Sequence, residues 1–116
     1  MEAKAVTVGV PVRDLERATE WYRAAFGLGE PDLVPMEGLA EYDLGAFWLQ
    51  LAAAPERAGR EGLTVNISVA DAGGLRDDLA GKGLEVSVLQ RFEGVVEFFA
   101  LTDPDGNTIG FVTELA

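Results

Sequence analysis

The stretch Phe98-Phe-Ala-Leu-Thr-Asp-Pro-Asp-Gly-Asn-Thr-Ile-Gly-Phe-Val112 predicts a β-hairpin, and this hairpin decides the fold. Apolar runs lie on both sides of a short polar turn, as two paired strands require. Within the turn, Pro104 fixes its own φ and Gly106 can adopt a positive φ. Asp103 can accept hydrogen bonds from the N–H groups that follow it. The last two strands of the chain are therefore predicted to be antiparallel neighbours.

Two segments upstream of this hairpin combine a strand pattern with a helix start. Thr7–Asp14 reads TVGVPVRD and Thr64–Asp71 reads TVNISVAD, and the two align without a gap. Valine or isoleucine at every second position predicts a strand with one apolar face. Asp14 and Asp71 are predicted N-caps, because their carboxylates can accept from N–H groups of a first helical turn. The match indicates an internal duplication.

The same order of elements, strand, helix, strand, strand, strand, occurs twice along the chain. Three further strands are predicted after the first helix, at Leu33–Met36, Ala40–Leu44 and Phe47–Ala52. Three more are predicted after the second helix, at Leu84–Gln90, Val95–Leu101 and Thr108–Thr113. Gly27 or Gly29 is expected to end the first helix and Gly83 the second. The predicted fold class is α+β, with module one at about residues 4–54 and module two at about residues 62–116. Each module would bury its valine face beneath its helix, and two such sheets side by side would enclose a concave surface for a ligand.

The composition bounds the chemistry and the partners of the protein. Its 116 residues include no cysteine and no histidine, which excludes disulfides, thiolate nucleophiles and the commonest general base. Twenty acidic and nine basic residues give a formal charge of −11. We therefore expect neither nucleic acid nor a membrane as a partner, whereas a cationic small molecule would be attracted. The sequence shows no signal peptide and no membrane span, so a cytoplasmic location is expected.

Two motifs resemble a known family. Val12–Leu28, which reads VRDLERATEWYRAAFGL, is similar to the opening module of the vicinal oxygen chelate superfamily. This superfamily includes glyoxalase I, extradiol dioxygenases, and fosfomycin and bleomycin resistance proteins. Phe99–Asn107 resembles its closing hairpin, and the resemblance covers essentially the whole chain. It implies two tandem βαβββ modules that form a cupped, barrel-like eight-stranded sheet with helices on the outer face, usually in a homodimer.

The resemblance also implies metal-ligand positions, and this sequence departs from the family at each of them. Metal-dependent members carry a histidine where this chain has Thr7, and the corresponding residue of the second module is Thr64. A carboxylate or amide position falls at Gln50, and the glutamate expected after the hairpin turn is replaced by Gly110. Two hydroxyls, an amide and a glycine cannot hold Zn²⁺, Fe²⁺ or Ni²⁺ against water. We therefore expect no metal in the usual place and no cofactor.

The residues expected to face the cavity are neutral, with one large aromatic side chain. Trp48 offers a surface for stacking or for a cation–π contact, and hydroxyl and amide groups can orient a ligand. The predicted ligand-binding residues are Thr7, Trp48, Gln50, Thr64, Asn66, Ser68, Phe99 and Gly110.

The strand at 95–101 can present either of two faces to the cavity. One face carries Glu97 and Phe99, and the other carries Phe98 and Ala100. Where burial raises the pKa of Glu97, that carboxylate could act as a general base, which makes Glu97 a weak catalytic candidate.

The favoured function is metal-free binding of a small molecule, as in the bleomycin-resistance type of protein. The ligand would be cationic or aromatic and drug-like, held in the cavity between the sheets of a homodimeric protein. One alternative is a metal-dependent lyase, isomerase or dioxygenase with relocated ligands. Another is a metal-free enzyme that uses a carboxylate base, and a third is a structural or regulatory module whose cavity is filled.

Overall fold

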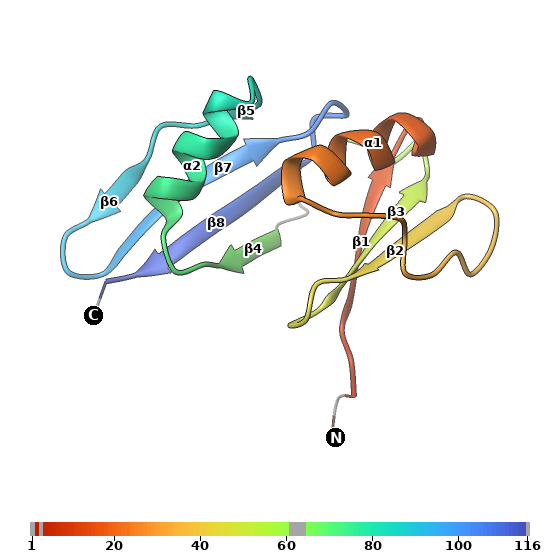
Figure 1. The fold of residues 1–116 in the computed structure, drawn as a ribbon, viewed down its shortest axis with the longest axis horizontal. Helices are drawn as coiled ribbons and strands as arrows, with labels where there is room; N and C mark the ends of the chain where they lie inside the picture. The colour runs from red at the N-terminus through yellow and green to blue at the C-terminus, as the bar shows by residue number, and fades with distance from the viewer. Residues whose placement is uncertain (1, 3, 61–64, 116) are drawn as a thin grey trace. The chain divides into compact units, whose positions relative to one another are not determined.

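The computed structural model describes residue 2, residues 4–60 and residues 65–115. The chain forms two compact units, Met1–Arg60 and Glu61–Ala116, called here unit 1 and unit 2. Both combine strands with a helix, so the predicted α+β fold class is confirmed (Figure 1). Within these ranges no helix has the length and apolar character needed to cross a bilayer. The predicted site residue Thr64 lies outside the described residues.

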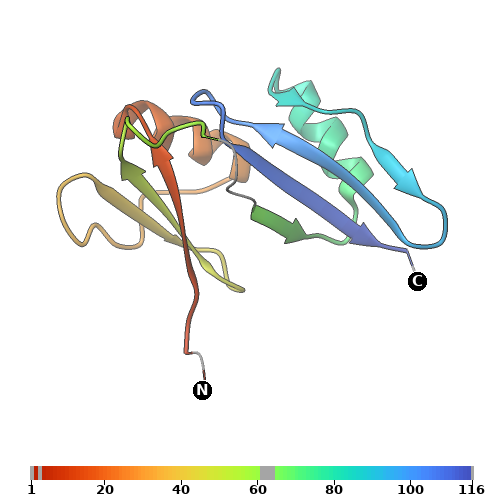
Figure 2. The same cartoon turned by 180° about the vertical axis from the view of Figure 1, so that it is seen from behind.

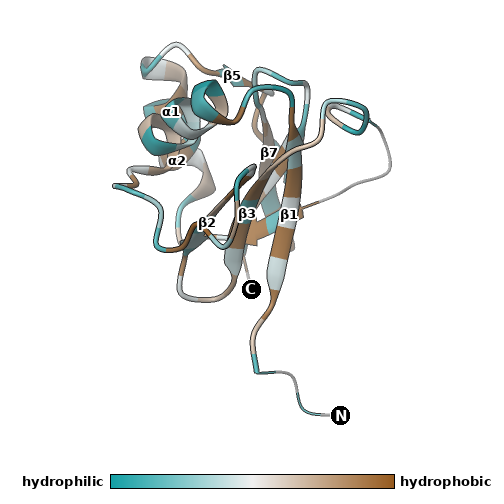
Figure 3. Ribbon diagram, turned by 90° about the vertical axis from the view of Figure 1, so that its right-hand side faces the viewer, coloured by the Kyte–Doolittle hydropathy of each residue, from teal (hydrophilic) through white to brown (hydrophobic). Residues whose placement is uncertain are grey.

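Unit 1 is a three-stranded sheet with a helix on one face. Its elements are β1 (Thr7–Val12), α1 (Leu15–Phe26), β2 (Leu39–Asp43) and β3 (Trp48–Ala53). The strand order is β1-β3-β2, with β3 parallel to β1 and antiparallel to β2. Alternate side chains form the core with α1, where Val12, Tyr22, Tyr42 and Leu51 are at most 1% exposed. Figure 3 shows this alternation as hydrophobic and paler bands along β1.

Unit 2 is a five-stranded sheet with a helix on one face. Its elements are β4 (Val65–Ser68), α2 (Ala72–Gly81), β5 (Glu85–Val86), β6 (Gln90–Phe92), β7 (Val96–Thr102) and β8 (Thr108–Glu114). The strand order is β4-β8-β7-β5, and β6 also pairs with β7. β7 and β8 are antiparallel, so the predicted hairpin is confirmed. Figure 2 shows this sheet from the side opposite α2.

The helix ends follow from the local sequence. Asp14 Oδ1 accepts a hydrogen bond from the Arg17 N–H at 3.1 Å, as an N-cap does. Asp71 is the equivalent N-cap of α2. Gly27, one of the two glycines predicted to end α1, has a φ of 68° and donates its N–H to the Arg23 carbonyl. This left-handed C-cap favours glycine, which has no Cβ to clash.

The prediction of a single eight-stranded sheet is corrected by the structure, because the strands form separate three-stranded and five-stranded sheets. Leu33–Met36 is not a strand in the structure and contributes one bridge, from Leu33 to Glu41. Pro31 and Pro35 lie two residues on either side of Leu33. Neither has the N–H group that a continued ladder needs, so the pairing stops at the bridge.

The predicted strand Leu84–Gln90 is divided into β5 and β6 by the residues around Ser87. The Ala100 N–H donates to Ser87 Oγ at 2.8 Å, so a side chain occupies a place that a strand carbonyl would take. The Ser87 carbonyl instead accepts from Arg76 Nε of α2 at 2.8 Å. A side chain of the strand and a side chain of the helix therefore replace ladder hydrogen bonds at this point.

Candidate functional site

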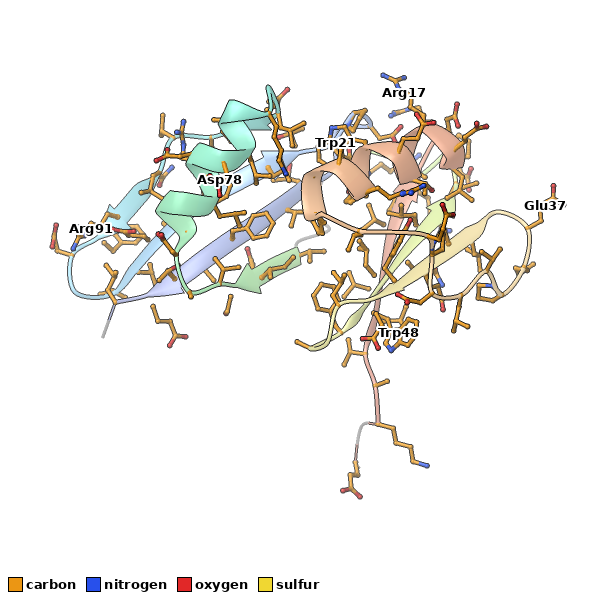
Figure 4. All side chains as sticks on the ribbon, in the orientation of Figure 1. Arg17, Trp21, Glu37, Trp48, Asp78 and Arg91 are labelled. Carbon is orange, nitrogen blue, oxygen red and sulfur yellow. The ribbon has the colours of Figure 1, made fainter. Side chains whose placement is uncertain are left out.

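The face of the unit 1 sheet opposite α1 carries three of the predicted ligand-binding residues. Thr7 pairs with Trp48 in the register of β1 and β3, and Gly9 pairs with Gln50. Paired positions point to the same side of a sheet, so Thr7, Trp48 and Gln50 share one face. We call it the unit 1 open face. Figure 4 shows Trp48 on the side of this sheet away from α1.

Two carboxylates that the sequence analysis did not single out lie on the same face. The antiparallel register pairs Glu41 with Gln50 and Asp43 with Trp48. The signal for them was the alternation of β2, where Glu41 and Asp43 are interleaved with the buried Ala40 and Tyr42. A strand with one apolar face sends its remaining side chains to the other face. The unit 1 open face is therefore acidic as well as aromatic.

The carboxamide of Gln50 has a fixed orientation. Its Nε2 donates to Glu41 Oε2 at 2.7 Å. A methyl group at Gly9 would lie 3.4 Å from Gln50 Oε1, so the amide oxygen extends over that glycine. The Glu41 carboxylate and the Gln50 amide oxygen both accept hydrogen bonds. This part of the face is therefore suited to a ligand that donates them.

An exposed apolar side chain, Leu33, continues the unit 1 open face beyond β2. Leu33 forms the bridge with Glu41, so its side chain lies beside that carboxylate, and Leu33 is 52% exposed. Val34 and Met36 in the same segment are also exposed. A ligand with an apolar body and a positively charged group matches apolar side chains next to carboxylates.

The corresponding face of unit 2, called the unit 2 open face, is neutral around Gly110, and Glu114 lies on the same face at the end of β8. β4 pairs with β8 so that Asn66 lies beside Gly110, and β7 places Ala100 on the other side of Gly110. Ser68 belongs to the same face through its pairing with Val112. The structure thus resolves the two readings of the 95–101 strand: Ala100 and its alternate neighbour Phe98 share the face of Gly110.

Asn66 and Gly110 fit each other closely on the unit 2 open face. A Cβ at position 110 would meet Asn66 Oδ1 and would lie 3.3 Å from Asn66 Cγ. The position of Gly110 in this register is equivalent to that of Gln50 in unit 1, as Asn66 is to Gly9. The two units therefore place one carboxamide and one glycine in neighbouring strands, in exchanged positions.

A shallow hollow lies at the ends of β4 and β8 in unit 2. Its volume is about 380 Å³, and it is lined by Ser68, Val69, Ala70, Val112, Thr113 and Glu114. The Thr113 hydroxyl is already engaged, since it accepts from the Ala72 N–H at 2.8 Å and donates to the Val69 carbonyl at 2.9 Å. Ser68 and Glu114 supply the other polar side chains of the hollow.

Two predicted residues lie on the helix side of the unit 2 sheet instead. Phe99 is 1% exposed and stacks on Phe111 with ring centroids 5.3 Å apart. Glu97 pairs with Arg91 at 3.4 Å, and its alternation with Phe98 places it on the same side as Phe99. Phe99 is therefore a core residue, a correction to the predicted ligand-binding residues. Neither Phe99 nor Glu97 shares the face of Gly110, so neither belongs to the candidate site.

The residues at the metal positions implied by the resemblance do not fit a divalent transition metal. Thr7 and Gln50 could offer a metal only neutral oxygen atoms, and Gly110 has no side chain. The Gln50 amide also donates a hydrogen bond from Nε2 to Glu41. Among the described residues, no group of three or more aspartate or glutamate side chains is placed to hold a metal ion. Strong binding of such an ion needs several anionic or imidazole ligands.

Comparison with known proteins identifies the family. A family model described as Glyoxalase/Bleomycin resistance protein/Dioxygenase superfamily matches residues 4–111. The chain therefore belongs to the glyoxalase/bleomycin resistance protein/dioxygenase superfamily. No curated protein matches the sequence.

Solved structures of the same fold come from proteins with different names. A glyoxalase/bleomycin resistance protein from Catenulispora acidiphila is 28% identical, with a TM-score of 0.80 over 96% of this chain and 98% of that one. TnmS3, an antibiotic binding protein from Streptomyces, is 20% identical, with a TM-score of 0.79 over 97% of both chains. Lactoylglutathione lyase from Agrobacterium tumefaciens is 19% identical, with a TM-score of 0.77 over 97% of this chain and 95% of that one. The last two similarities show the fold alone.

Proposed function

We propose that this member of the superfamily binds a small cationic, aromatic molecule without a metal ion, and that the unit 1 open face makes the principal contacts. The observation that carries the proposal is the arrangement around Trp48. The indole lies between Thr7 and Asp43 in the sheet, one row from the hydrogen-bonded pair of Gln50 and Glu41. An aromatic face next to carboxylates attracts a cation with an apolar body.

The charge of the chain supports the same ligand class. A formal charge of −11 raises the local concentration of cations near the surface and speeds their association. The side chains on the open face of the unit 1 sheet include Glu41 and Asp43 and no arginine or lysine from β1, β2 or β3. An anionic ligand would meet repulsion there, so we expect selection for positive charge.

Metal-free binding is supported by the chemistry of the residues at the family's metal positions. Thr7 and Gln50 supply neutral oxygen atoms, and Gly110 supplies no side chain at all. A metal-dependent lyase or dioxygenase would need ligands elsewhere. Purified protein that retains a stoichiometric transition metal after dialysis against a chelator would support that alternative and contradict this one.

Three compounds with the same aromatic body and different charges test the ligand class. They are 2-phenylethylamine, 2-phenylethanol and phenylacetate, titrated into ¹⁵N-labelled protein while the indole N–H signals of Trp48 and Trp21 are followed by NMR. We expect the amine to bind most tightly, with a dissociation constant of about 1 mM for so small a compound. Phenylacetate should bind most weakly. Equal binding of all three would contradict the proposal.

Single substitutions locate the binding face. Trp48→Ala should abolish binding of the amine, and Glu41→Gln should remove most of its advantage over the alcohol, roughly three- to tenfold. Glu20→Gln is the matched control, because Glu20 is an exposed carboxylate of α1. Trp21→Phe, also on α1, should leave binding unchanged. In this variant the one remaining indole N–H signal belongs to Trp48.

We also propose that the protein is a homodimer. Exposed apolar side chains support this, since Val34, Met36, Val88 and Phe92 are all more than half exposed. Such groups are commonly covered at protein–protein contacts. A cytoplasmic location stays a prediction from the sequence.

A further inference from the structure

The hydrogen bond between Gln50 and Glu41 fixes the orientation of the carboxamide on the unit 1 open face. Gln50 Nε2 donates to Glu41 Oε2 at 2.7 Å. A carboxylate only accepts hydrogen bonds, so Glu41 selects the nitrogen of the amide and directs the amide oxygen away from itself. That oxygen lies on the side of Gly9, where a methyl group would be 3.4 Å from Oε1. The amide oxygen is therefore held in one place.

The amide oxygen and the carboxylate supply hydrogen-bond acceptors in the same row of the sheet. Among the described residues, no donor bonds Gln50 Oε1, and Glu41 accepts through Oε2. Gly9 is exposed, whereas Gln50 and Glu41 are half-buried. A ligand can therefore reach the Gln50 oxygen across Gly9, which has no side chain to cover it. Gln50 Oε1 and Glu41 Oε1 are the two acceptors that this ligand meets.

The neighbouring carboxylate, Asp43, is engaged by its own turn. Asp43 Oδ1 accepts from the Gly45 N–H at 2.9 Å. Asp43 lies beside Trp48, so the row of the indole holds a carboxylate that already has a donor. The positive group of a ligand is therefore better placed beside Gln50 and Glu41, with its aromatic body on Trp48.

Trp48 lies within reach of such a ligand. It precedes Gln50 by two residues on β3, so the two side chains share a face and lie about 7 Å apart along the strand. A ring stacked on the indole and a nitrogen at the end of a short alkyl chain span this distance. The unit 1 open face thus offers an aromatic surface at one point and two oxygen acceptors at the other.

Two kinds of organic cation differ in how they meet these oxygens. A primary or secondary ammonium group donates an N–H group to each acceptor, and the charge strengthens such hydrogen bonds. A quaternary ammonium group is attracted to the carboxylate and to the indole but has no N–H group to donate. Its methyl groups would cover the Gln50 oxygen and separate it from water, which leaves a half-buried acceptor without a partner.

We propose that the unit 1 open face selects an aromatic ligand whose cationic nitrogen carries at least two N–H groups, and that Gln50 sets this selectivity. The inference rests on the binding function proposed above and narrows its ligand class. Primary and monomethylated arylalkyl amines belong to the class, as do aromatic guanidinium and amidinium compounds. Tertiary and quaternary ammonium compounds do not. Glu41 positions the Gln50 amide and supplies the opposite charge.

Stepwise methylation of one compound tests the requirement for two N–H groups. 2-Phenylethylamine and its N-methyl, N,N-dimethyl and N,N,N-trimethyl derivatives are all positively charged at pH 7, and each methyl group replaces one N–H group. Their affinities are measured from the indole N–H signal of Trp48 in ¹⁵N-labelled protein. We expect similar dissociation constants for the first two compounds. The trimethyl compound should bind roughly tenfold more weakly, with the dimethyl compound between.

Gln50→Met removes the acceptor oxygen and keeps an unbranched side chain of similar length. The variant should lose roughly three- to tenfold in affinity for 2-phenylethylamine and little for the trimethyl compound, so most of the difference between them should disappear. Gln90→Met is the matched control, because Gln90 is an exposed residue of β6 and the other glutamine of the chain. It should keep the selectivity of the natural chain. Circular dichroism checks that both variants fold.

The side-chain carbonyl carbon of Gln50 gives a second readout, which needs no substitution. In natural protein labelled with ¹³C and ¹⁵N, its signal should shift when the primary or the monomethyl amine saturates the site, because a new donor contacts the oxygen. At equal saturation the trimethyl compound should leave the signal nearly unchanged. A purely structural role for Gln50 would not distinguish the two compounds.

The outcomes separate this inference from the function on which it rests. A loss of affinity with the second and third methyl groups that disappears in Gln50→Met supports both. Equal affinity for all four compounds, or affinity that rises with methylation, overturns the inference and keeps cation binding by the unit 1 open face. A loss of full size in folded Gln50→Met overturns the role of Gln50, as does a Gln50 carbonyl signal that the primary amine leaves unchanged. Failure of all four compounds to bind rejects the proposed function itself.

Discussion

The carboxamide of Asn66 occupies the space into which a side chain at Gly110 would extend. In unit 1 the equivalent pair is reversed, with the Gln50 amide over Gly9. Each unit thus places one amide and one glycine side by side in neighbouring strands, and the strand that carries the amide in unit 1 corresponds to the strand that carries the glycine in unit 2. Gly110 therefore leaves room for the Asn66 amide on the unit 2 open face, and it also supplies no side chain that could bind a metal.

Gly110→Ala should displace the Asn66 side chain and weaken any ligand contact that Asn66 makes. We expect a stability change within about 1 kcal/mol, because the amide is at the end of an exposed side chain that can rotate, and alanine lowers the entropy of the unfolded chain. Asn66→Ala should have the same effect on ligand binding, and the double substitution should add nothing further. Gly9→Ala is the control for the stability change, since its methyl group would make an ordinary contact with Gln50 Oε1 at 3.4 Å. Additive losses in the double variant would contradict the coupling.

The turn of the β7–β8 hairpin depends on one buried carboxylate. Asp103 is 4% exposed and accepts from the N–H groups of Asp105 and Asn107 at 2.9 and 2.8 Å, and from Asn107 Nδ2 at 2.8 Å. Asp103→Ala should lower the free energy of unfolding by about 2–3 kcal/mol, because three partly buried donors lose their partner. Asp103→Asn keeps one acceptor oxygen and should cost less. Urea denaturation of the three proteins orders them, and equal stability of the alanine and natural chains would contradict the account.

The Thr113 hydroxyl connects β8 to the start of α2. It accepts from the Ala72 N–H and donates to the Val69 carbonyl, so it satisfies a helix N-terminal donor that has no partner inside the helix. Thr113→Val should cost about 1–2 kcal/mol of unfolding free energy. Thr113→Ser retains the hydroxyl and should recover most of that loss. If valine and serine are equally destabilising, packing and not the hydrogen bonds explains the effect.

Tyr42 is predicted to make the protein less stable at alkaline pH. Its hydroxyl is buried and has no hydrogen-bond partner among the described residues. Burial raises the pKa of Tyr42 above its ordinary 10.0; nearby Arg23 lowers it, and Glu30 and Asp32 raise it. The folded state thus holds the phenol proton more tightly than the unfolded state. Stability from this source is present below about pH 10 and is lost as the pH rises through the folded-state pKa.

Tyr42→Phe isolates this effect. At pH 7 the variant should be as stable as the natural protein or more stable by about 1 kcal/mol, because an unsatisfied hydroxyl leaves the core. Above about pH 10 the advantage of the variant should increase. Denaturation curves at pH 7 and at alkaline pH measure both quantities. A less stable phenylalanine variant at pH 7 would show that the hydroxyl has a partner.

Features encoded within a few residues were predictable from the sequence. Asp14 and Asp71 cap helices where expected, because the N-cap contact involves residues only three positions apart. The β7–β8 hairpin was predictable because the Asp103–Asn107 turn leaves few ways to join its strands. Strand patterning was less decisive where Phe98 and Phe99 are adjacent, since two neighbouring aromatic residues give no alternation.

Features that depend on register were not predictable. Glu41 and Asp43 join the candidate site only because β2 pairs with β3 so that they lie beside Gln50 and Trp48. The side-chain hydrogen bonds of Ser87 that divide the predicted strand depend on Ala100, thirteen residues away. Local sequence preference does not determine contacts of this range, because register is set by which faces are buried.

The most direct test of metal-free binding at the unit 1 open face is a fluorescence titration with 2-phenylethylamine. The Trp21→Phe variant leaves Trp48 as the single indole, and one sample is dialysed against a chelator while a second receives added Zn²⁺. We predict a saturable change in Trp48 fluorescence with the same dissociation constant in both samples, and a dissociation constant roughly three- to tenfold larger in the Glu41→Gln variant. Binding that appears only in the sample with Zn²⁺ would contradict the account.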